Sequence, residues 1–389
     1  MTNDLILTLN AGSSTVKLGF FEAGRTEITA LASGVIDFRD EPFEIRLNHD
    51  GQRLSQPLTA RLSDPNALLQ QSFDWLGQQF DLSRLTMIGH RVVHGGDIFT
   101  GPATITDEVL DQIEALAQLA PLHQPQCLRL IHAMRAFHPD VKQTASFDTA
   151  FHATNSALVR RFAIPRRLHD QGIKRYGFHG LSYRYIARQL ADLPPGARVV
   201  AAHLGSGASL CAMEGGISRD SSMGFSTLDG IPMATRTGAL DPGVILHLMG
   251  PLGLNLEQVE TMLYHESGLL GVSGFEADSR ELMASDRPEA AEAIALFCHR
   301  IAGEVARLAT TLNGLDALVF TAGIGENQPE IRAMVAGQLG WLGLELDPAA
   351  NAANARRFST PESRITALVI PTDEESIIAE EAFSLKETE

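Results

Sequence analysis

The sequence predicts an α/β protein built from two similar domains. Its 389 residues are more than one hydrophobic core ordinarily organises, so two domains are expected. Short apolar segments alternate with longer amphipathic ones, a pattern typical of α/β folds. A glycine-rich hairpin near residue 10 has a counterpart near residue 205. This repetition half a chain apart indicates an internal duplication, with one copy opening each domain.

The predicted elements follow from hydrophobic periodicity and turn residues. Strands at 5–9 and 16–21 form the first hairpin, and residues 198–213 form the second, with a further turn at Gly215-Gly216. Helices are expected at 107–119, 256–264, 288–312, 329–339 and 374–385. Strands are expected before Phe147, at 317–320 and at 368–370, and residues 321–327 are expected to form a turn.

Composition narrows the class of protein. A hydrophobic content of 44% and a charged content of 20% are typical of a soluble globular chain. The net charge, 31 − 47 = −16, argues against nucleic acid or an anionic membrane as a partner. Cys127, Cys211 and Cys298 show no CxxC spacing, so neither a disulfide framework nor a zinc site is expected. The absence of a signal-like start and of a long apolar run predicts a cytoplasmic location without a transmembrane span.

The turn from Asn10 to Lys17 contains small residues, hydroxyls and a lysine. Backbone N–H groups at such a tip can surround an anion, Lys17 can contact phosphate, and Asn10 can bind a metal or its water shell. An ordinary hairpin turn is the competing interpretation, and it would be preferred for one such turn alone. The similar turn at 204–209 favours a pair of phosphate-binding turns. Neither turn is a GxxxxGK[ST] P-loop, because a strand follows where that motif requires a helix.

Residues 321–327 form a second glycine-rich segment, between a buried strand and a helix. Bare backbone and a helix N-terminus could lie against a nucleotide there. A tight connection without a ligand is equally consistent with the pattern. GxGxxG is not completed, so a dinucleotide fold is disfavoured.

Five charged or titratable residues lie next to glycines or at expected strand ends: Arg91, His123, Asp148, His179 and Arg236. Each has a structural alternative, such as a salt-bridged arginine, a solvated turn histidine, a satisfied buried carboxylate or aromatic packing. Together they would form a positive cluster suited to the charge that spreads over phosphoryl oxygens during transfer. No GxSxG motif is present, so hydrolysis by a nucleophilic triad is unsupported.

The chain resembles the acetokinase family, the acetate kinases of the sugar kinase/heat-shock/actin superfamily. The resemblance runs from residue 7 to about residue 379 through ten segments in family order: LNAGSSTVK, GHRVVHGG, APLHQP, FDTAFH, RYGFHG, HLGSGAS, SMGF, TRTG, FTAGIGEN and IPTDEE. It implies two duplicated ribonuclease-H-like (actin-like ATPase) domains with a cleft between them. Residues 1–147 and 372–389 would form the N-terminal domain, to which the C-terminal helix returns. Residues 148–371 would form the nucleotide-binding and dimerisation domain of a homodimer.

The implied reaction is reversible phosphoryl transfer from ATP to acetate, giving acetyl phosphate and ADP, with Mg²⁺ or Mn²⁺. Asn10 and Glu374 would hold the metal, and Lys17 would contact phosphate. The catalytic set would be Asp148, Arg91, His179, Arg236 and His123. Because acetate is already ionised, Asp148 is expected to orient Arg91 or the metal and not to move a proton. The substrate pocket would be lined by Arg91, Val93, Leu122, Phe178 and Thr227. The nucleotide would lie on His203, Leu204, Gly205, Ser206, Gly207, Asp278, Ser279, Arg280, Gly323, Ile324, Gly325, Glu326 and Asn327.

Several positions depart from the family pattern. Ser206 stands where the family usually has Asn, and Thr227 stands where it has a proline that lines the acyl pocket. The other departures are Ala234 for Gly, Ala239 for Asp, Gln124 for Asn and Asp373 for Asn. They bear on the phosphoryl donor, which is pyrophosphate in some relatives, and on the acyl chain, which could be that of propionate or another short carboxylate.

Two other classes of function remain as alternatives. A nucleotide-gated binding protein could use the same two-domain scaffold, because a fold does not fix a function. It would not need the pair of arginines, and it should carry an added partner-binding segment. An inactive paralogue is the second alternative, suggested by Ser206, Thr227 and Ala239. Turnover with a carboxylate and a donor separates these possibilities.

Overall fold

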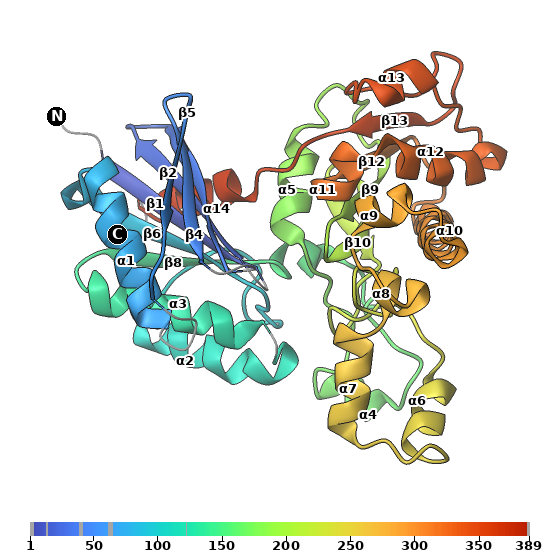
Figure 1. Ribbon diagram of the computed structural model, residues 1–389, viewed down its shortest axis with the longest axis horizontal. Helices are drawn as coiled ribbons and strands as arrows, with labels where there is room; N and C mark the ends of the chain where they lie inside the picture. The colour runs from blue at the N-terminus through green and yellow to red at the C-terminus, as the bar shows by residue number, and fades with distance from the viewer. Residues whose placement is uncertain (1–3, 13–14, 39–41, 61–64, 122, 387–389) are drawn as a thin grey trace. The chain divides into compact units, whose positions relative to one another are not determined.

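The structure is a computed structural model that describes residues 4–12, 15–38, 42–60, 65–121 and 123–386 (Figure 1). The chain divides into two compact units. Unit 1 comprises Met1–Phe151 and Asp373–Glu389, and unit 2 comprises His152–Thr372. The first boundary falls within η3 (Ala150–Thr154), four residues from the expected 147/148, and the second lies one residue from the expected 371/372.

Unit 1 is built on an eight-stranded sheet in the order β5-β4-β3-β2-β1-β6-β8-β7. The strands are β1 (Asp4–Ala11), β2 (Thr15–Ala23), β3 (Ile28–Asp37), β4 (Glu44–His49), β5 (Gln52–Pro57), β6 (Leu85–Val92), β7 (Ala103–Thr104) and β8 (Lys142–Phe147). The helices are α1 (Pro65–Gln79), η1 (Leu82–Arg84), α2 (Asp107–Ala115), η2 (Leu116–Leu119), α3 (Gln124–Phe137) and α14 (Glu374–Ser384). β1 runs antiparallel to β2 and parallel to β6, which in turn is parallel to β8.

Alternation along β1 places its side chains on both faces of this sheet, as strand geometry requires. Leu5, Leu7 and Leu9 pack with residues of α1 and α3 in one core, whereas Ile6 packs with Ala379 and other residues of α14 in a second. Helix α14 approaches the sheet closely at Gly89, where an added Cβ would lie 2.6 Å from a methyl of Ile378. The C-terminal helix therefore belongs to the fold of unit 1.

Unit 2 is built on a five-stranded sheet in the order β11-β10-β9-β12-β13. The strands are β9 (Arg198–Leu204), β10 (Ala208–Glu214), β11 (Ile217–Ser221), β12 (Ala317–Thr321) and β13 (Thr366–Val369). The helices are α4 (Arg166–Asp170), α5 (Gly180–Arg188), α6 (Pro242–Met249), α7 (Leu256–His265), α8 (Gly268–Ser273), α9 (Ser279–Ala284), α10 (Pro288–Thr311), α11 (Ala322–Asn327), α12 (Pro329–Gln338), η4 (Gly340–Leu342) and α13 (Pro348–Ala352). Figure 1 shows the long helix α10 beside the sheet and α4, α6 and α7 grouped at one end of the unit.

The two sheets share a topology, which confirms the predicted duplication. In unit 1 the order β3-β2-β1-β6-β8 combines an antiparallel meander with two strands parallel to β1. In unit 2 the order β11-β10-β9-β12-β13 repeats this arrangement around β9. The fold is thus a pair of α/β domains of the actin-like ATPase class. Across the described residues, no helix is both long enough and apolar enough to cross a membrane.

One local prediction was wrong. Residues 321–327, expected to be a turn, include the short helix α11, which begins directly after β12. Ala322 makes the change of direction in one residue by adopting a left-handed φ of 63°. Its N–H donates to Glu326 Oε1 at 2.7 Å, so a side chain one turn later stabilises this conformation. A glycine-rich composition does not indicate that stabilisation.

Candidate functional site

Three neighbouring parallel strands of unit 1 present polar side chains at their carboxyl ends. Asn10 lies near the end of β1, Arg91 near the end of β6, and Asp148 directly follows β8. The Arg91 guanidinium donates to Asp148 Oδ2 from Nη2 at 2.6 Å and from Nε at 3.1 Å. Its Nη1 donates to Asn10 Oδ1 at 3.1 Å and to the Ala11 carbonyl at 3.3 Å. The sheet register therefore brings three predicted site residues into one hydrogen-bonded group.

Arg91 is held as a cation in this group. Burial opposes its charge, but the carboxylates of Asp148 and Glu374 outweigh burial and raise the pKa of Arg91. Asp148 is 1% exposed, so its charge is screened little by water and interacts strongly with the guanidinium. Burial also raises the pKa of the neighbouring Cys127 thiol, which therefore stays protonated. The fixed positive charge of Arg91 can bind a carboxylate or a phosphate.

Two adjacent glutamates at the start of α14 meet the Asn10 amide. Asn10 Nδ2 donates to Glu374 Oε2 at 2.8 Å and to Glu375 Oε1 at 2.9 Å. Burial raises the pKa of Glu375, and the like charge of Glu374 adds to this effect, whereas Lys17 and the Asn10 hydrogen bond oppose it. Lys17 is paired with Asn10 across the β1–β2 hairpin. Glu375 was not predicted as a site residue, because the family resemblance implied a role only for its neighbour Glu374.

These oxygens fit a hard cation. Mg²⁺ is commonly bound by one or two carboxylates together with substrate phosphates and water, so a large set of protein ligands is not required. Glu374, 7% exposed, supplies carboxylate oxygens of that kind. The Asn10 amide nitrogen donates to Glu374, and the Asn10 amide oxygen accepts from Arg91. Across the described residues, no group of three or more His, Cys, Asp and Glu side chains with metal-site geometry is found. The arrangement suits a metal that shares its coordination with a phosphate, not a closed structural site.

The loop that follows Arg91 is held by Gln124. Gln124 accepts a hydrogen bond from the His94 N–H at 3.1 Å and donates to the His94 carbonyl at 3.0 Å and the Ile113 carbonyl at 3.3 Å. Gln124 thus has a structural role at a position where the sequence departs from the family pattern. His123 occupies the N-cap of α3 and is partly exposed, and Val93 is buried. Leu122, predicted to line the substrate pocket, lies outside the described residues.

Unit 2 carries a stacked pair of histidines. The rings of His179 and His203 are parallel to within 19°, with centroids 4.3 Å apart. His179 Nδ1 lies 2.8 Å from Ser209 Oγ, and the Tyr183 hydroxyl lies 2.6 Å from the same atom. His179 adopts a left-handed φ of 56° at the N-cap of α5, directly before Gly180. These contacts fix the orientation of the His179 ring.

His203 is positioned by a further hydroxyl, because its Nδ1 lies 2.8 Å from Ser182 Oγ. Ser182 in turn accepts a hydrogen bond from Thr372 Oγ1 at 2.9 Å. The sequence motifs contained Ser209 but gave it no role, and Ser182 and Tyr183 were missed. Their polar side chains lie in the core of the unit, which is rare unless they have partners.

Arg236 and His179 lie on the same side of the turn between β9 and β10. A Cβ added to Gly207 would lie 3.5 Å from His179 Nε2 and 3.8 Å from Arg236 Nη1. Arg236 Nη1 also donates to the Thr227 carbonyl at 3.3 Å. Phe178 and Thr227 are the two predicted pocket residues in unit 2. Both are almost fully buried, at 1% and 8% exposed. The His179 imidazole and the Arg236 guanidinium next to Gly207 would stabilise negative charge bound there.

The predicted nucleotide segments converge within unit 2. β9 and β12 are parallel neighbours, and Gly205 approaches Ala322, with an added Cβ only 3.8 Å from the Ala322 Cβ. Gln328 donates to Ser279 Oγ at 2.7 Å, which ties the end of α11 to the start of α9. Asp278 caps α9 and binds its own neighbour Arg280, whose side chain is exposed. Leu204 is fully buried, so only its backbone could reach a ligand.

Glu326 has a structural contact beside these segments. Its Oε1 accepts from the N–H groups of Ala322 at 2.7 Å and Thr372 at 3.1 Å. Asn327 donates to the Gly323 carbonyl at 2.9 Å. Two of the predicted nucleotide residues therefore shape the start and end of α11, while a Cβ added to Gly323 would have no atom within 4 Å.

Comparisons with known proteins agree on one family. The profile described as "Acetokinase family" matches residues 5–380. The acetate kinase of Rhodopseudomonas palustris (strain TIE-1) is 47% identical, with 98% of each chain covered. A crystal structure of a propionate kinase from Francisella tularensis subsp. tularensis SCHU S4 is similar at a TM-score of 0.90 and 35% identity, covering 98% of this chain and 99% of that one. A crystal structure of Porphyromonas gingivalis acetate kinase has a TM-score of 0.85 at 32% identity, covering 99% and 100%.

Proposed function

Because the chain belongs to the acetokinase family, an enzyme family of phosphotransferases with a carboxyl group as acceptor, we propose that it is an acetate kinase. It would transfer the terminal phosphoryl group of ATP to acetate, reversibly. A carboxylate oxygen forms a bond to the γ-phosphorus while the bond from that phosphorus to the β–γ bridging oxygen breaks, which leaves acetyl phosphate and ADP. No proton has to move, since acetate is ionised at neutral pH. The observation that carries the proposal is Arg91 fixed between Asp148 and Asn10.

On the acceptor side, Arg91 binds the acetate carboxylate. Its fork of donors can pair with a carboxylate, and the contact with Asp148 holds the side chain in one orientation before the substrate arrives. Asp148 is then a positioning residue for Arg91. His123 assists from the N-cap of α3, and Val93 supplies apolar surface for the methyl group of acetate.

On the donor side, Arg236 and His179 stabilise the phosphoryl group in transfer. Both face Gly207, and charge on equatorial phosphoryl oxygens is what such donors recognise. Ser209 positions His179, and Ser182 positions His203. The nucleotide lies along residues 203–207, 278–280 and 323–327, and Lys17 contacts phosphate. The proposal assigns the polar groups of both units to one reaction.

Glu374 and Asn10 would hold Mg²⁺, or Mn²⁺ in its place. When bound, the metal neutralises phosphate charge and orients the phosphate chain. The chain's own contribution is to keep the Glu374 carboxylate in position, through the Asn10 hydrogen bond at 2.8 Å.

Propionate or another short carboxylate is the second candidate acceptor. The solved relative at TM-score 0.90 is a propionate kinase. Thr227 stands at a predicted pocket position where the family has a proline, which changes the shape available to the acyl chain. Ser206 stands where the family usually has Asn, so pyrophosphate is the second candidate phosphoryl donor beside ATP.

A matrix of donors and acids tests the proposal directly. The protein is incubated with Mg²⁺, hydroxylamine, ATP or pyrophosphate, and acetate, propionate or butyrate, and acyl hydroxamate is measured. We expect the highest kcat/KM with ATP and acetate. Absence of product in all six combinations would contradict a carboxylate kinase, and nucleotide-dependent capture of a partner protein without product would favour the binding-protein alternative. A higher kcat/KM with propionate would correct the acid but not the chemistry.

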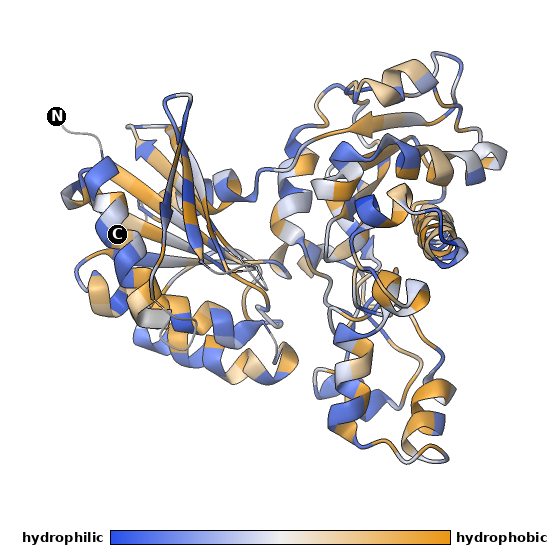
Figure 2. Ribbon diagram, viewed as in Figure 1, coloured by the Kyte–Doolittle hydropathy of each residue, from blue (hydrophilic) through white to orange (hydrophobic). Residues whose placement is uncertain are grey.

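We also propose that the protein is a homodimer that associates through α6. This helix has the sequence PGVILHLM and contains no buried residue. Its exposed apolar side chains continue into the segment that follows it: Val244, Leu246, Met249, Leu252 and Leu256. Figure 2 shows α6 as a largely hydrophobic ribbon. Five exposed apolar side chains within one short segment of a protein of net charge −16 indicate a contact surface, and a second copy is the occupant that the family resemblance implies.

A further inference from the structure

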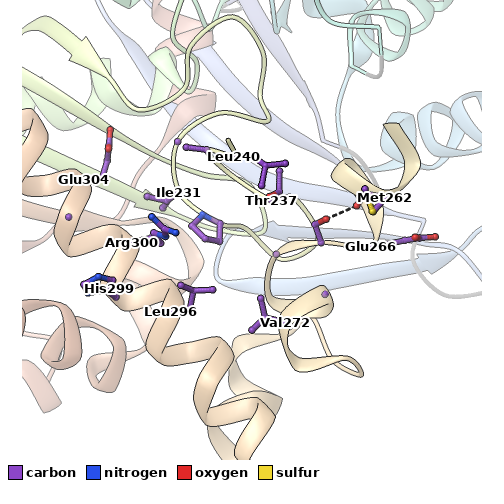
Figure 3. A pocket seen from close by; sticks show the side chains of 17 residues that line it. Ile231, Thr237, Leu240, Met262, Glu266, Val272, Leu296, His299, Arg300 and Glu304 are labelled. Carbon is purple, nitrogen blue, oxygen red and sulfur yellow. Dashed lines mark hydrogen bonds between the residues drawn. The ribbon is translucent and has the colours of Figure 1, made fainter. Parts of the chain in front are cut away.

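Unit 2 contains a cavity of about 530 Å³ that the proposed reaction does not use. Three segments enclose it: the loop from Gly230 to Leu240, the end of α7 with the start of α8, and the middle of α10. Figure 3 shows Ile231, Leu240, Leu296 and Val272 around it, with Arg300 reaching in from α10. The volume lies in the range of small-molecule sites, and the walls combine apolar side chains with polar and charged ones.

Arg300 provides a cation in the wall of the cavity. Arg300 is exposed to it, and no hydrogen bond or ion pair of its guanidinium is found among the described residues. Two glutamates also line the cavity, but Glu304 is ion-paired with Arg307 at 2.8 Å, and Figure 3 shows Glu266 pointing away from Arg300. Arg300 therefore offers a guanidinium next to the apolar side chains of the wall, which suits an anionic group attached to an apolar body.

The loop that forms one wall also carries Arg236. Main-chain hydrogen bonds join this loop to the α7–α8 wall: Thr237 N–H donates to the Leu263 carbonyl at 3.2 Å, and Ser267 N–H donates to the Thr235 carbonyl at 2.9 Å. Gly268, with φ 63°, lies so close that an added Cβ would be 2.7 Å from the Arg236 carbonyl oxygen. A ligand in the cavity would thus touch residues on both sides of Arg236 and the helix ends that hold them.

We propose that this cavity binds a small amphipathic organic anion, with Arg300 as the anion-binding residue, and that occupancy alters carboxylate turnover through the Arg236 loop. The site is distinct from the groups around Gly207. Binding energy that differs between two arrangements of the loop would shift their populations and so change the affinity for substrate. The coupling half of this inference rests on the proposed function, whereas the binding half does not.

Binding is tested with hexanesulfonate, which has an anionic head and an apolar chain and cannot serve as a carboxylate substrate. Calorimetry on the full-length protein should show one class of site per chain, and hexanol and hexyltrimethylammonium should not bind there. Arg300→Gln should weaken hexanesulfonate binding about tenfold or more, in line with the loss of a charge-assisted hydrogen bond. Ala239→Asp, which adds a carboxylate to the same wall, should weaken it as well. Arg91→Ala should not, because Arg91 belongs to unit 1.

The outcomes separate the possibilities. No binding, equal binding of hexanol, or binding that survives Arg300→Gln would overturn the anion site. Loss of binding in Arg91→Ala would assign the sulfonate to the carboxylate site. For the coupling, saturating hexanesulfonate should change the KM for acetate about fivefold or more in the parent protein and not in Arg300→Gln. Acetate should in turn change the hexanesulfonate Kd in the same direction, because coupling between two binding sites is mutual. If hexanesulfonate binds but neither the KM for acetate nor the hexanesulfonate Kd changes, the coupling is wrong and the anion site stands. If hexanesulfonate binds but no turnover is measured, only the proposed function is contradicted.

Discussion

Arg91 and Asp148 are joined by two hydrogen bonds to one carboxylate oxygen, from Nη2 at 2.6 Å and Nε at 3.1 Å. Arg91 lies on β6 and Asp148 directly follows the adjacent parallel strand β8, where the Asp148 N–H also donates to the Val92 carbonyl at 3.1 Å. The pair is therefore fixed by the sheet itself. Both hydrogen bonds orient the Arg91 guanidinium toward Asp148 Oδ2. The roles of Arg91 and of Asp148 can therefore be tested by separate substitutions.

Arg91→Ala should reduce kcat/KM for acetate by roughly two orders of magnitude, because about 3 kcal/mol of transition-state stabilisation is lost with a positioned donor. Steady-state kinetics with ATP and acetate measures this. Arg198→Ala is the matched control, since Arg198 makes a similar two-nitrogen contact with Asp316 at the surface of unit 2. Near-normal kcat/KM in Arg91→Ala would contradict the assigned role.

Asp148→Asn should lower kcat/KM about tenfold while leaving the shape of the pH profile of kcat unchanged. The amide keeps the size of the side chain but loses the charge that orients Arg91, and no proton transfer is needed for an ionised acceptor. Rates measured over a range of pH in both proteins test this. If the variant lost an ionisation limb that the parent shows, Asp148 would have to be reassigned as a proton-transfer group.

Gly207→Ala should abolish most activity without unfolding the protein. The added methyl would lie 3.5 Å from His179 Nε2 and 3.8 Å from Arg236 Nη1, which is ordinary van der Waals contact but occupies the space beside both groups. We expect kcat to fall about 100-fold with a nearly unchanged Tm. Gly337→Ala, in α12 with no atom within 4 Å of the added Cβ, should leave kcat unchanged and raise stability by about 0.5–1 kcal/mol. A parallel fall of kcat and Tm in Gly207→Ala would indicate misfolding instead.

The sequence could predict the parts of this site that depend on local chemistry. Both hairpins follow from strand composition and glycine turns, and the ends of β6 and β8 follow from apolar runs that stop at Arg91 and Asp148. It could not predict that Glu375, 365 residues after Asn10, accepts a hydrogen bond from the Asn10 amide, because the family resemblance assigned a role only to Glu374. Similarly, Ser182 and Ser209 are ordinary residues in sequence and acquire their roles only by facing His203 and His179.

Stability should fall on acidification between pH 6.5 and 4 because of buried neutral histidines. Burial lowers the pKa of His90, of His94 and of His152 to about 4 in each case, from 6.5 in the unfolded chain. Over this window the unfolded chain binds more protons, so the free energy of unfolding rises with pH and is fully restored above pH 6.5. Each histidine lowers it by about 2 kcal/mol at pH 5. Burial raises the pKa values of Glu304 and Glu375, which acts with the opposite sign.

His90→Gln isolates one of these contributions. His90 Nε2 lies 2.8 Å from Gln143 Oε1, and a glutamine amide can keep a hydrogen bond there without titrating. Denaturant unfolding of both proteins at pH 7 and pH 5 should show a loss of stability that is about 2 kcal/mol smaller in the variant. Equal losses in the two proteins would mean that His90 is not kept neutral in the folded state.

Leu246→Glu should convert a dimer into a monomer. Leu246 is 72% exposed on α6, and a buried charge in an apolar contact between two copies would be left without a partner. Light scattering after size exclusion should give twice the mass of the 42.1 kDa chain for the parent protein and the mass of one chain for the variant. Trp341→Glu is the control, because Trp341 is 73% exposed and lies on η4, directly after α12 in the chain. Figure 1 shows α12 and α6 at different ends of unit 2. A variant that stays dimeric, or a parent that is already monomeric, would show that α6 is not the contact. Since α6 begins three residues after Ala239, a monomer that also binds hexanesulfonate differently would connect the dimer contact to the Arg300 cavity.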